Sequence, residues 1–374
     1  MKCISVFLLT FLTALIAAAQ SNGAGAAPAA AGEARAAAPV VSLEWESDSH
    51  NDMEKSADVW EKLLEANSTN EEAWLNFYKA RRAMALLEDG AKPGKRNQSE
   101  LNTIIGRMSN AVPSSYAFNY CNYVNGNKSD ESFAYLKNAI ALRPNDKELW
   151  DDMLCNAVLS ENTNEIKSWV KKMNDARLFT WGEVEYNRNT LNSVEQNGVL
   201  LTNGNVDTTP LYMLQSEGFR TDVIIVCLDW IGSARYLHLL EAKLKVSPGV
   251  IKLNDTQATY NAVMNLGKKR AVYTALTVPK SLMSSYISQL YCTGLALKYS
   301  ETPINNLSSL VYNWESLFQK NYWSSSDALT RNYLLPAQLL LSYYNASGAK
   351  DKSAELQKLI EQKKRIPLEP YIQR

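Results

Sequence analysis

The sequence predicts a mixed α and α/β fold with a helical-repeat N-terminal part, a small parallel α/β layer and C-terminal helices. Two similar helix-pair patterns lie 76 residues apart in the N-terminal half, as the positions of Trp74 and Trp150 show. Runs at 199–202, 223–228 and 271–279, rich in β-branched and apolar residues, alternate with helical patterns, which is typical of parallel sheets. Apolar residues at helical spacing return after Lys280 and continue to the end of the chain.

Composition and charge exclude several classes of protein. The 374 residues hold 39 Lys and Arg and 39 Asp and Glu, so the formal net charge is +0 and no nucleic-acid partner is expected. The only two histidines are His50 and His238, far apart in the chain, which argues against a multi-histidine metal site and against most histidine-centred catalysis. We therefore expect no cofactor, no metal site and no catalytic residues, and favour a protein that is not an enzyme.

Residues 1–19 have the pattern of a cleaved signal peptide. Lys2 precedes an apolar run from Ile4 to Ala19 that ends in three alanines. The run has 16 residues, fewer than the ~20 that span a bilayer, although a membrane anchor is the alternative. We expect cleavage before Gln20, export to the periplasm, the outer membrane or the medium, and no transmembrane segment after cleavage. Cys3 lies before the run, so a lipid anchor is not expected.

Changes in composition divide the rest of the chain. Residues 20–42 are rich in Ala, Gly and Pro and predict a flexible spacer. Residues 43–196 are predicted to form the helical-repeat domain, 197–280 the small α/β module and 281–374 the C-terminal helical part.

Four cysteines remain after the predicted cleavage, namely Cys121, Cys155, Cys227 and Cys292. Their wide spacing and apolar neighbours favour buried free thiols over a disulfide scaffold. A bridge between Cys121 and Cys155 on neighbouring helices is the alternative.

The N-terminal helices contain a repeat. Aligning Trp74 with Trp150 places Asn70 on Asp146, and either side chain suits the cap of the helix that follows it. Weaker helix pairs are predicted at 101–118 and 166–191. The pattern resembles the tetratricopeptide repeat, whose usual period is ~34 residues, and a generic helical bundle is the alternative. The resemblance implies a concave surface for a protein partner.

A polar loop follows the first predicted strand, at 199–202. Asn203, Asn205, Asp207 and Thr208 are the candidate ligand-binding residues, because ligands of α/β layers bind at the carboxyl ends of strands. A carboxylate among amides and hydroxyls suits a sugar, a cation or a peptide. The alternative is a structural turn in which Asp207 accepts backbone N–H bonds and caps a helix from Leu211. The loop has no phosphate-binding glycine pattern.

This region resembles a known family. Residues 198–204, Asp207-Thr208, Pro210-Leu211 and Leu214-Gln215 are similar to a soluble segment of bacterial membrane proteins described as protein-O-mannosyltransferase-like, or as a domain of unknown function. The resemblance covers about 196–300. The family has Asp and Asn where this chain has Asn205 and Val206, and its transmembrane catalytic part has no counterpart here. The resemblance thus implies a fold relation and a cell-envelope setting, and no transferase activity.

Together these patterns predict a secreted or periplasmic protein-interaction protein, a scaffold or adaptor of the bacterial cell envelope, with another envelope protein as partner. The alternative is a carbohydrate-binding or carbohydrate-processing protein that uses the loop around Asp207, with a glycan as ligand. For His238, one helical turn before Glu241, a hydrogen-bonded structural role is expected.

Overall fold

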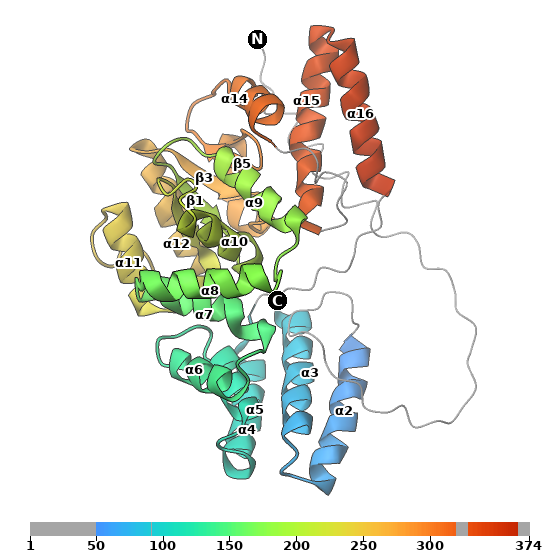
Figure 1. Cartoon of the computed structure of the whole chain (residues 1–374), viewed down its shortest axis with the longest axis vertical. Coiled ribbons are helices and arrows are strands. Elements are labelled where there is room, and N and C mark those ends of the chain that lie inside the picture. The colour runs from blue at the N-terminus through green and yellow to red at the C-terminus, as the bar shows by residue number, and fades with distance from the viewer. Residues whose placement is uncertain (1–49, 91, 319–327, 366–374) are drawn as a thin grey trace, which may run out of the picture. The chain divides into compact units, whose positions relative to one another are not determined.

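A computed structural model describes residues 50–90, 92–318 and 328–365 of the chain. Figure 1 shows the order of its parts: a stack of helices, a sheet flanked by helices, and further helices at the C-terminal end. The predicted fold class is therefore confirmed. The predicted signal peptide and spacer lie outside the described residues.

Helices occupy the positions in the N-terminal part at which the repeat predicts them, and neighbouring helices pack as hairpins. Helix α2 packs on α3, α4 on α5, and α7 on α8, and α5 also packs on α6. The helices are α2 (His50–Ala66), α3 (Glu71–Asp89), α4 (Lys95–Ala111), α5 (Tyr116–Asn125), α6 (Ser132–Leu142), the short 3₁₀ helix η1 (Lys147–Leu149), α7 (Trp150–Leu159), α8 (Thr163–Asp175) and α9 (Trp181–Asn192).

Both predicted caps of the repeat are present. The side chain of Asn70 accepts a hydrogen bond from the Ala73 amide at 3.1 Å. The side chain of Asp146 accepts one from the Glu148 amide at 3.0 Å, so that the second helix opens as a 3₁₀ turn before it becomes α7. Trp74 and Trp150 are both buried. The alignment at an offset of 76 residues therefore pairs structurally equivalent positions.

A second contact recurs from hairpin to hairpin. In each case an aromatic ring near the start of the second helix of a pair is covered by a cationic side chain from the next helix or its end. The pairs are Arg107 over Trp74 at 5.1 Å, Arg143 over Tyr116 at 4.1 Å and Lys172 over Trp150 at 4.3 Å. Each such pair contributes about 0.5–1 kcal/mol at exposed sites. The recurrence supports a tandem arrangement.

The sheet is mixed and has the strand order β2-β1-β3-β5-β4. Its strands are β1 (Val199–Thr202), β2 (Ile224–Cys227), β3 (Val272–Ala275), β4 (Leu290–Cys292) and β5 (Ala296–Tyr299). The three predicted strands run parallel, with β1 between β2 and β3. The helices between them are α10 (Asn205–Ser216), η2 (Leu228–Trp230), α11 (Ala234–Leu244), α12 (Thr256–Met264) and η3 (Asn265–Lys268).

The expectation of helices from Lys280 onward is wrong for residues 290–299. Here β4 and β5 form an antiparallel pair, and β5 joins the edge of β3, so the sheet is not purely parallel. These strands have three and four residues, too few for an alternating pattern, and the pairing of β5 with β3 is a contact that the local sequence does not encode.

Helices form the other elements among the described residues after Lys280, as predicted. They are α13 (Lys280–Met283), η4 (Ser284–Gln289), α14 (Asn306–Tyr312), η5 (Asn313–Leu317), η7 (Ala328–Tyr333), α15 (Leu334–Ser347) and α16 (Lys350–Arg365). Helix α15 ends at Gly348, which has a φ of 74° that favours glycine, and α16 packs back on α15.

The four cysteines of the described region are buried and free. The alternative of a Cys121–Cys155 bridge is therefore wrong. Burial raises the pKa of Cys227 and of Cys292 to about 12, so both thiols are protonated at neutral pH.

The loop between α5 and α6 connects the helical stack to the α/β module. Asn127 and Lys128 have left-handed backbones, with φ of 49° and 56°, which is unfavourable for residues other than glycine. The carbonyl oxygen of Asn127 lies so close to Gly232 that a Cβ there would be 2.1 Å away. Asp130 accepts hydrogen bonds from Ser233 Oγ at 2.5 Å and from Arg235 Nε at 2.8 Å.

Gly232→Ala is therefore expected to lower the free energy of unfolding by about 1–3 kcal/mol, because the new methyl group collides with the Asn127 backbone. Gly106→Ala is the matched control. It lies in α4 with open space around its Cα and should raise stability by about 0.5–1 kcal/mol. Urea unfolding measures both, and equal effects would contradict the close approach of the loop.

Asp222 joins the starts of β1 and β2. It accepts hydrogen bonds from Arg220 Nε at 2.8 Å and from the Asn197 amide at 2.9 Å. The hydrogen bond from Arg220 is the main cause that lowers the pKa of Asp222 to about 2. Since the folded pKa lies below that of the unfolded chain, this carboxylate stabilises the fold above about pH 4, and the contribution is lost as the pH falls toward about 2.

Asp222→Asn should remove this pH dependence. Between pH 5 and pH 2 the wild type is expected to lose about 1 kcal/mol more than the variant, because solvent screens a partly exposed pair. Denaturant titrations at several pH values measure the difference. Asp175→Asn is the control, since Asp175 pairs with Lys171 on an exposed helix face. Parallel pH profiles for wild type and Asp222→Asn would refute the assignment.

Candidate functional site

The predicted site residues lie at the carboxyl end of β1, but not as a single open loop. Helix α10 begins at Asn205 rather than at Leu211, so three of the four candidates are in its first turn or beside it. Asp207 and Thr208 are buried, with 4% and 0% exposure, whereas Asn203 and Asn205 are half-buried. The prediction that a helix begins at Leu211 is wrong, because Pro210 is accommodated inside α10.

The carboxylate of Asp207 is turned inward. Its two oxygens accept hydrogen bonds from the backbone amides of Asn203, at 2.9 Å, and Gly204, at 2.8 Å. A third hydrogen bond comes from the hydroxyl of Thr277, in the segment that follows β3. Burial raises the pKa of Asp207, and these hydrogen bonds oppose the rise. Asp207 thus makes the contacts of the structural-turn alternative and links the ends of β1 and β3.

Asn205 points to a different set of residues. Its Nδ2 donates to Asp152 Oδ1 at 3.0 Å, and its Oδ1 accepts from Trp230 Nε1 at 3.1 Å and from Lys128 Nζ at 3.3 Å. The Thr208 hydroxyl, in contrast, lies 2.8 Å from that of Thr202 inside the module. The structure therefore separates the four predicted residues, and ligand binding by them stays a prediction.

The residues around Asn205 form what we call the Lys128 cluster: Lys128, Asp151, Asp152, Asn205 and Asp229. Lys128 comes from the α5–α6 loop, Asp151 and Asp152 from the first turn of α7, and Asp229 from the residues after β2. The Lys128 ammonium forms an ion pair with Asp229 and lies 3.6 Å from Asp152 Oδ1. Sequence reasoning found only Asn205, because the others are up to 101 positions from Lys128 and form no motif.

Within the Lys128 cluster, the positive charge of Lys128 and the negative charges of Asp152 and Asp229 stabilise one another. Burial by itself would lower the pKa of Lys128, but the carboxylates of Asp229 and Asp152 outweigh it and raise that pKa, so the ammonium stays protonated. Burial opposes ionisation of Asp229, yet Lys128 lowers its pKa. Asp151, only 2% exposed, has a raised pKa because of burial and of the Asp152 charge beside it. Chemically, the cluster is an acceptor for one cationic group.

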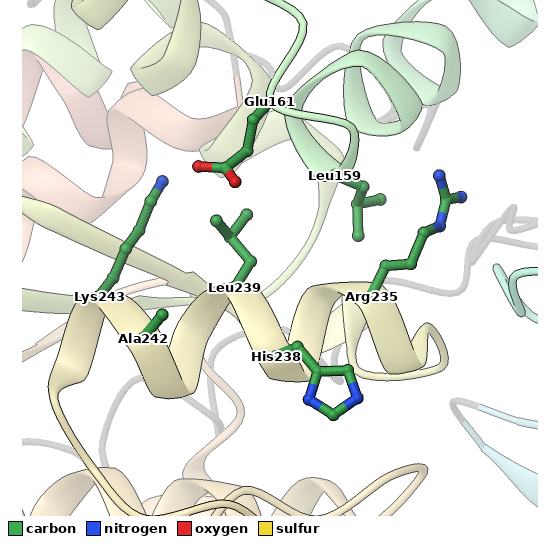
Figure 2. Close-up of a pocket in the computed structure, with 7 residues that line it drawn as sticks. All are labelled: Leu159, Glu161, Arg235, His238, Leu239, Ala242 and Lys243. Atoms are coloured by element: carbon green, nitrogen blue, oxygen red, sulfur yellow. The ribbon is translucent and has the colours of Figure 1, made fainter.

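A shallow groove of about 560 Å³ lies between the end of α7 and α11, and no residue of the Lys128 cluster lines it. In Figure 2, the ends of the Glu161 and Lys243 side chains point toward one another above Leu239, while the His238 ring points away from them. The His238 side chain is 79% exposed and 3.9 Å from Glu241, so the expected hydrogen-bonded structural role is wrong. Glu241 instead accepts the Gly249 amide at 2.6 Å.

The described residues were also considered for metal-binding groups and for membrane-spanning helices. Among them, no group of three or more His, Cys, Asp or Glu side chains is arranged to hold a metal ion. No helix in the same ranges is both long enough and apolar enough to cross a membrane.

Asp207→Ala is expected to lower the free energy of unfolding by about 3 kcal/mol, because two buried amides and a hydroxyl lose their acceptor. Asp255→Ala is the matched control. Asp255 is exposed and caps α12 through the Ala258 amide at 2.9 Å, a contact that contributes about 1 kcal/mol. Chemical denaturation compares the two. Equal losses would argue against the buried role of Asp207.

Comparison with known proteins gives one match for this region. A family model described as TMEM260-associated domain 2 matches residues 183–286, from α9 through β1, β2 and β3 to η4. A search of curated proteins gave no match. The matched segment contains Asn205, Asp207 and Asp229, whereas Lys128 and Asp152 lie before it. The α/β module, together with α9, is therefore similar to a domain of unknown function that is linked to a membrane-protein family.

Proposed function

We propose that this protein is a non-catalytic interaction protein, a scaffold or adaptor of the bacterial cell envelope whose partner is another envelope protein. The tandem helical hairpins carry this proposal. Stacked hairpins of this kind expose an extended surface, which proteins of similar architecture use to bind other proteins. Architecture alone does not fix function, so the side chains of the stack must also support the role.

Side chains on the stack are consistent with a binding surface. Leu63, Leu87 and Leu142 are between 38% and 51% exposed. Many charged groups nearby are engaged in pairs, such as Arg143 with Glu71 at 2.5 Å and Arg107 with Glu61 at 3.2 Å. A surface of scattered apolar side chains among paired charges suits a protein partner better than a nucleic acid, which needs clustered unpaired cations.

Export is part of this proposal and rests on the sequence of residues 1–19. The proposed mature protein begins at Gln20 and works in the periplasm, at the outer membrane or outside the cell. Intact-mass analysis of the protein recovered from its natural host would show the mature N-terminus. A mass that retains residues 1–19 would exclude cleavage.

The resemblance to protein-O-mannosyltransferase-like proteins enters at the level of the module only. We infer that the region at about 196–300 is an accessory module of the kind that such membrane proteins carry outside the bilayer. We propose no transferase activity for this chain on the strength of that resemblance.

A carbohydrate role is the second candidate, and the half-burial of Asn203 at the strand end is the observation that favours it. Its test is glycan-array binding by wild type and by Asn203→Ala, which leaves the amide hydrogen bond to Asp207 intact. Loss of a glycan signal in the variant would support the candidate, and absence of any signal in the wild type would exclude it.

Chemical cross-linking in envelope extracts tests the primary proposal. Full-length protein carrying an affinity tag is treated with a lysine-reactive cross-linker and purified. We expect one partner at stoichiometric yield, with cross-links at Lys62, Lys137 and Lys167, which are exposed on the stack. Lys352 and Lys358, exposed on α16, are the internal controls and should give few partner cross-links. Recovery of the protein alone, or cross-links spread evenly over both sets, would contradict the proposal.

A further inference from the structure

The ends of β1 and β2 present two oxygen acceptors to one point. Thr202 and Cys227 are register partners at the ends of these parallel strands, so the residues that follow them emerge side by side. Asn205 follows β1 and Asp229 follows β2, and both side chains contact Lys128 Nζ. Asp152 of α7 adds a carboxylate oxygen at 3.6 Å from the same nitrogen. Three acceptors from three elements thus converge on one ammonium group.

The Lys128 ammonium belongs to the α5–α6 loop of the helical stack, whose backbone is strained at Asn127 and Lys128. Residues in the left-handed region cost of order 1–3 kcal/mol each when they are not glycine, and they persist only where surrounding contacts hold them. Both Asn127 and Lys128 are in this region. Asn127 packs directly against Gly232, and Asp130 holds Ser233 and Arg235 on the next turn. These contacts hold the α5–α6 loop in the conformation that places the Lys128 ammonium beside Asn205 and Asp229.

The residues that contact Lys128 are divided between the segment that matches the family model and the part of the chain before it. The segment that matches the family model, 183–286, contributes Asn205 and Asp229, while the ammonium comes from outside it. Two of the three acceptors thus belong to the module, whereas the third, Asp152, and the cation itself belong to the helical stack. We propose that the carboxyl ends of β1 and β2 form a binding site for a primary ammonium group, a lysine side chain or an alkylammonium ion, which this chain fills with its own Lys128.

This inference is independent of the proposed scaffold function, since it concerns how the module recognises a cationic group. The chemistry is specific. The N–H donors of an ammonium serve the carboxylate of Asp229 and the amide oxygen of Asn205 as hydrogen-bond acceptors, and its charge is further balanced by Asp152 at 3.6 Å. A neutral alcohol of the same length cannot balance the two carboxylates, and a quaternary ammonium has no donors.

Chemical rescue of Lys128→Ala tests the site in the full chain. The substitution removes the side chain beyond Cβ, and n-propylammonium has the same three carbons and one nitrogen. We expect Lys128→Ala to lower the melting temperature by about 10 °C, since the largely buried Asp152 and the partly exposed Asp229 lose the cation that contacts them. Titration with n-propylammonium chloride should restore at least half of this loss in a saturable way. n-Propanol, tetramethylammonium chloride and sodium chloride should not.

Two further variants make the outcome decisive. In Lys128→Ala combined with Asp229→Asn, the recovery should disappear, because one of the carboxylates that hold the ammonium is gone. Lys172→Ala, which truncates a half-buried lysine that is stacked on Trp150, should show no recovery with n-propylammonium. Equal recovery with n-propanol, recovery that does not saturate, or recovery that survives Asp229→Asn would overturn the proposal and leave a purely structural ion pair.

If Lys128→Ala does not fold in buffer alone, the same titration is followed by far-ultraviolet circular dichroism. Return of the helical signal with n-propylammonium, and not with n-propanol, supports the site. A chain that stays unfolded at every concentration counts against it. Lys128→Arg provides a second reading, because a guanidinium is larger than the ammonium and should restore less stability than n-propylammonium restores to Lys128→Ala.

Discussion

The ammonium of Lys128, held by Asp229, Asp152 and Asn205, is the interaction on which the rest of the structure depends. A charge removed from water is stabilising only where it is paired and hydrogen-bonded. Here one cation connects the α5–α6 loop, the first turn of α7 and the ends of two strands. Each of these elements would carry an uncompensated charge or an unpaired polar group without the others, so the helical stack and the α/β module stabilise each other.

The same rule governs other buried polar groups of the chain. Inside the stack, the Lys79 ammonium lies 2.8 Å from Glu148 Oε2, and Tyr120 donates a hydrogen bond to the same carboxylate. Glu148 follows the capping residue Asp146, which also accepts a hydrogen bond from Tyr116 at 2.6 Å. The turn of one repeat therefore binds side chains of the two preceding hairpins. These acidic groups stabilise contacts between repeats, which is consistent with the proposed role in binding rather than in chemistry.

Local signals in the sequence predicted much of the fold. The caps Asn70 and Asp146, the three parallel strands and the buried free cysteines follow from patterns that span a few residues. In contrast, β4 and β5 were not predicted, since they exist through pairing with β3 rather than through their own residues. The beginning of α10 was placed six residues late, at Leu211, although Pro210 lies within the first two turns of the helix.

The sequence by itself determined the helices of the stack and the three parallel strands, because hydrophobic periodicity and capping side chains act within one or two turns of the chain. It also placed Asn205 and Asp207 after a strand, where α/β layers bind ligands. Only the tertiary structure decided what these residues contact. Asp207 turns inward to backbone amides, and Asn205 meets Lys128 and Asp152, which are 77 and 53 positions away. Ion pairs form between charges that are close in space, and a local sequence pattern does not specify which distant residue will be close.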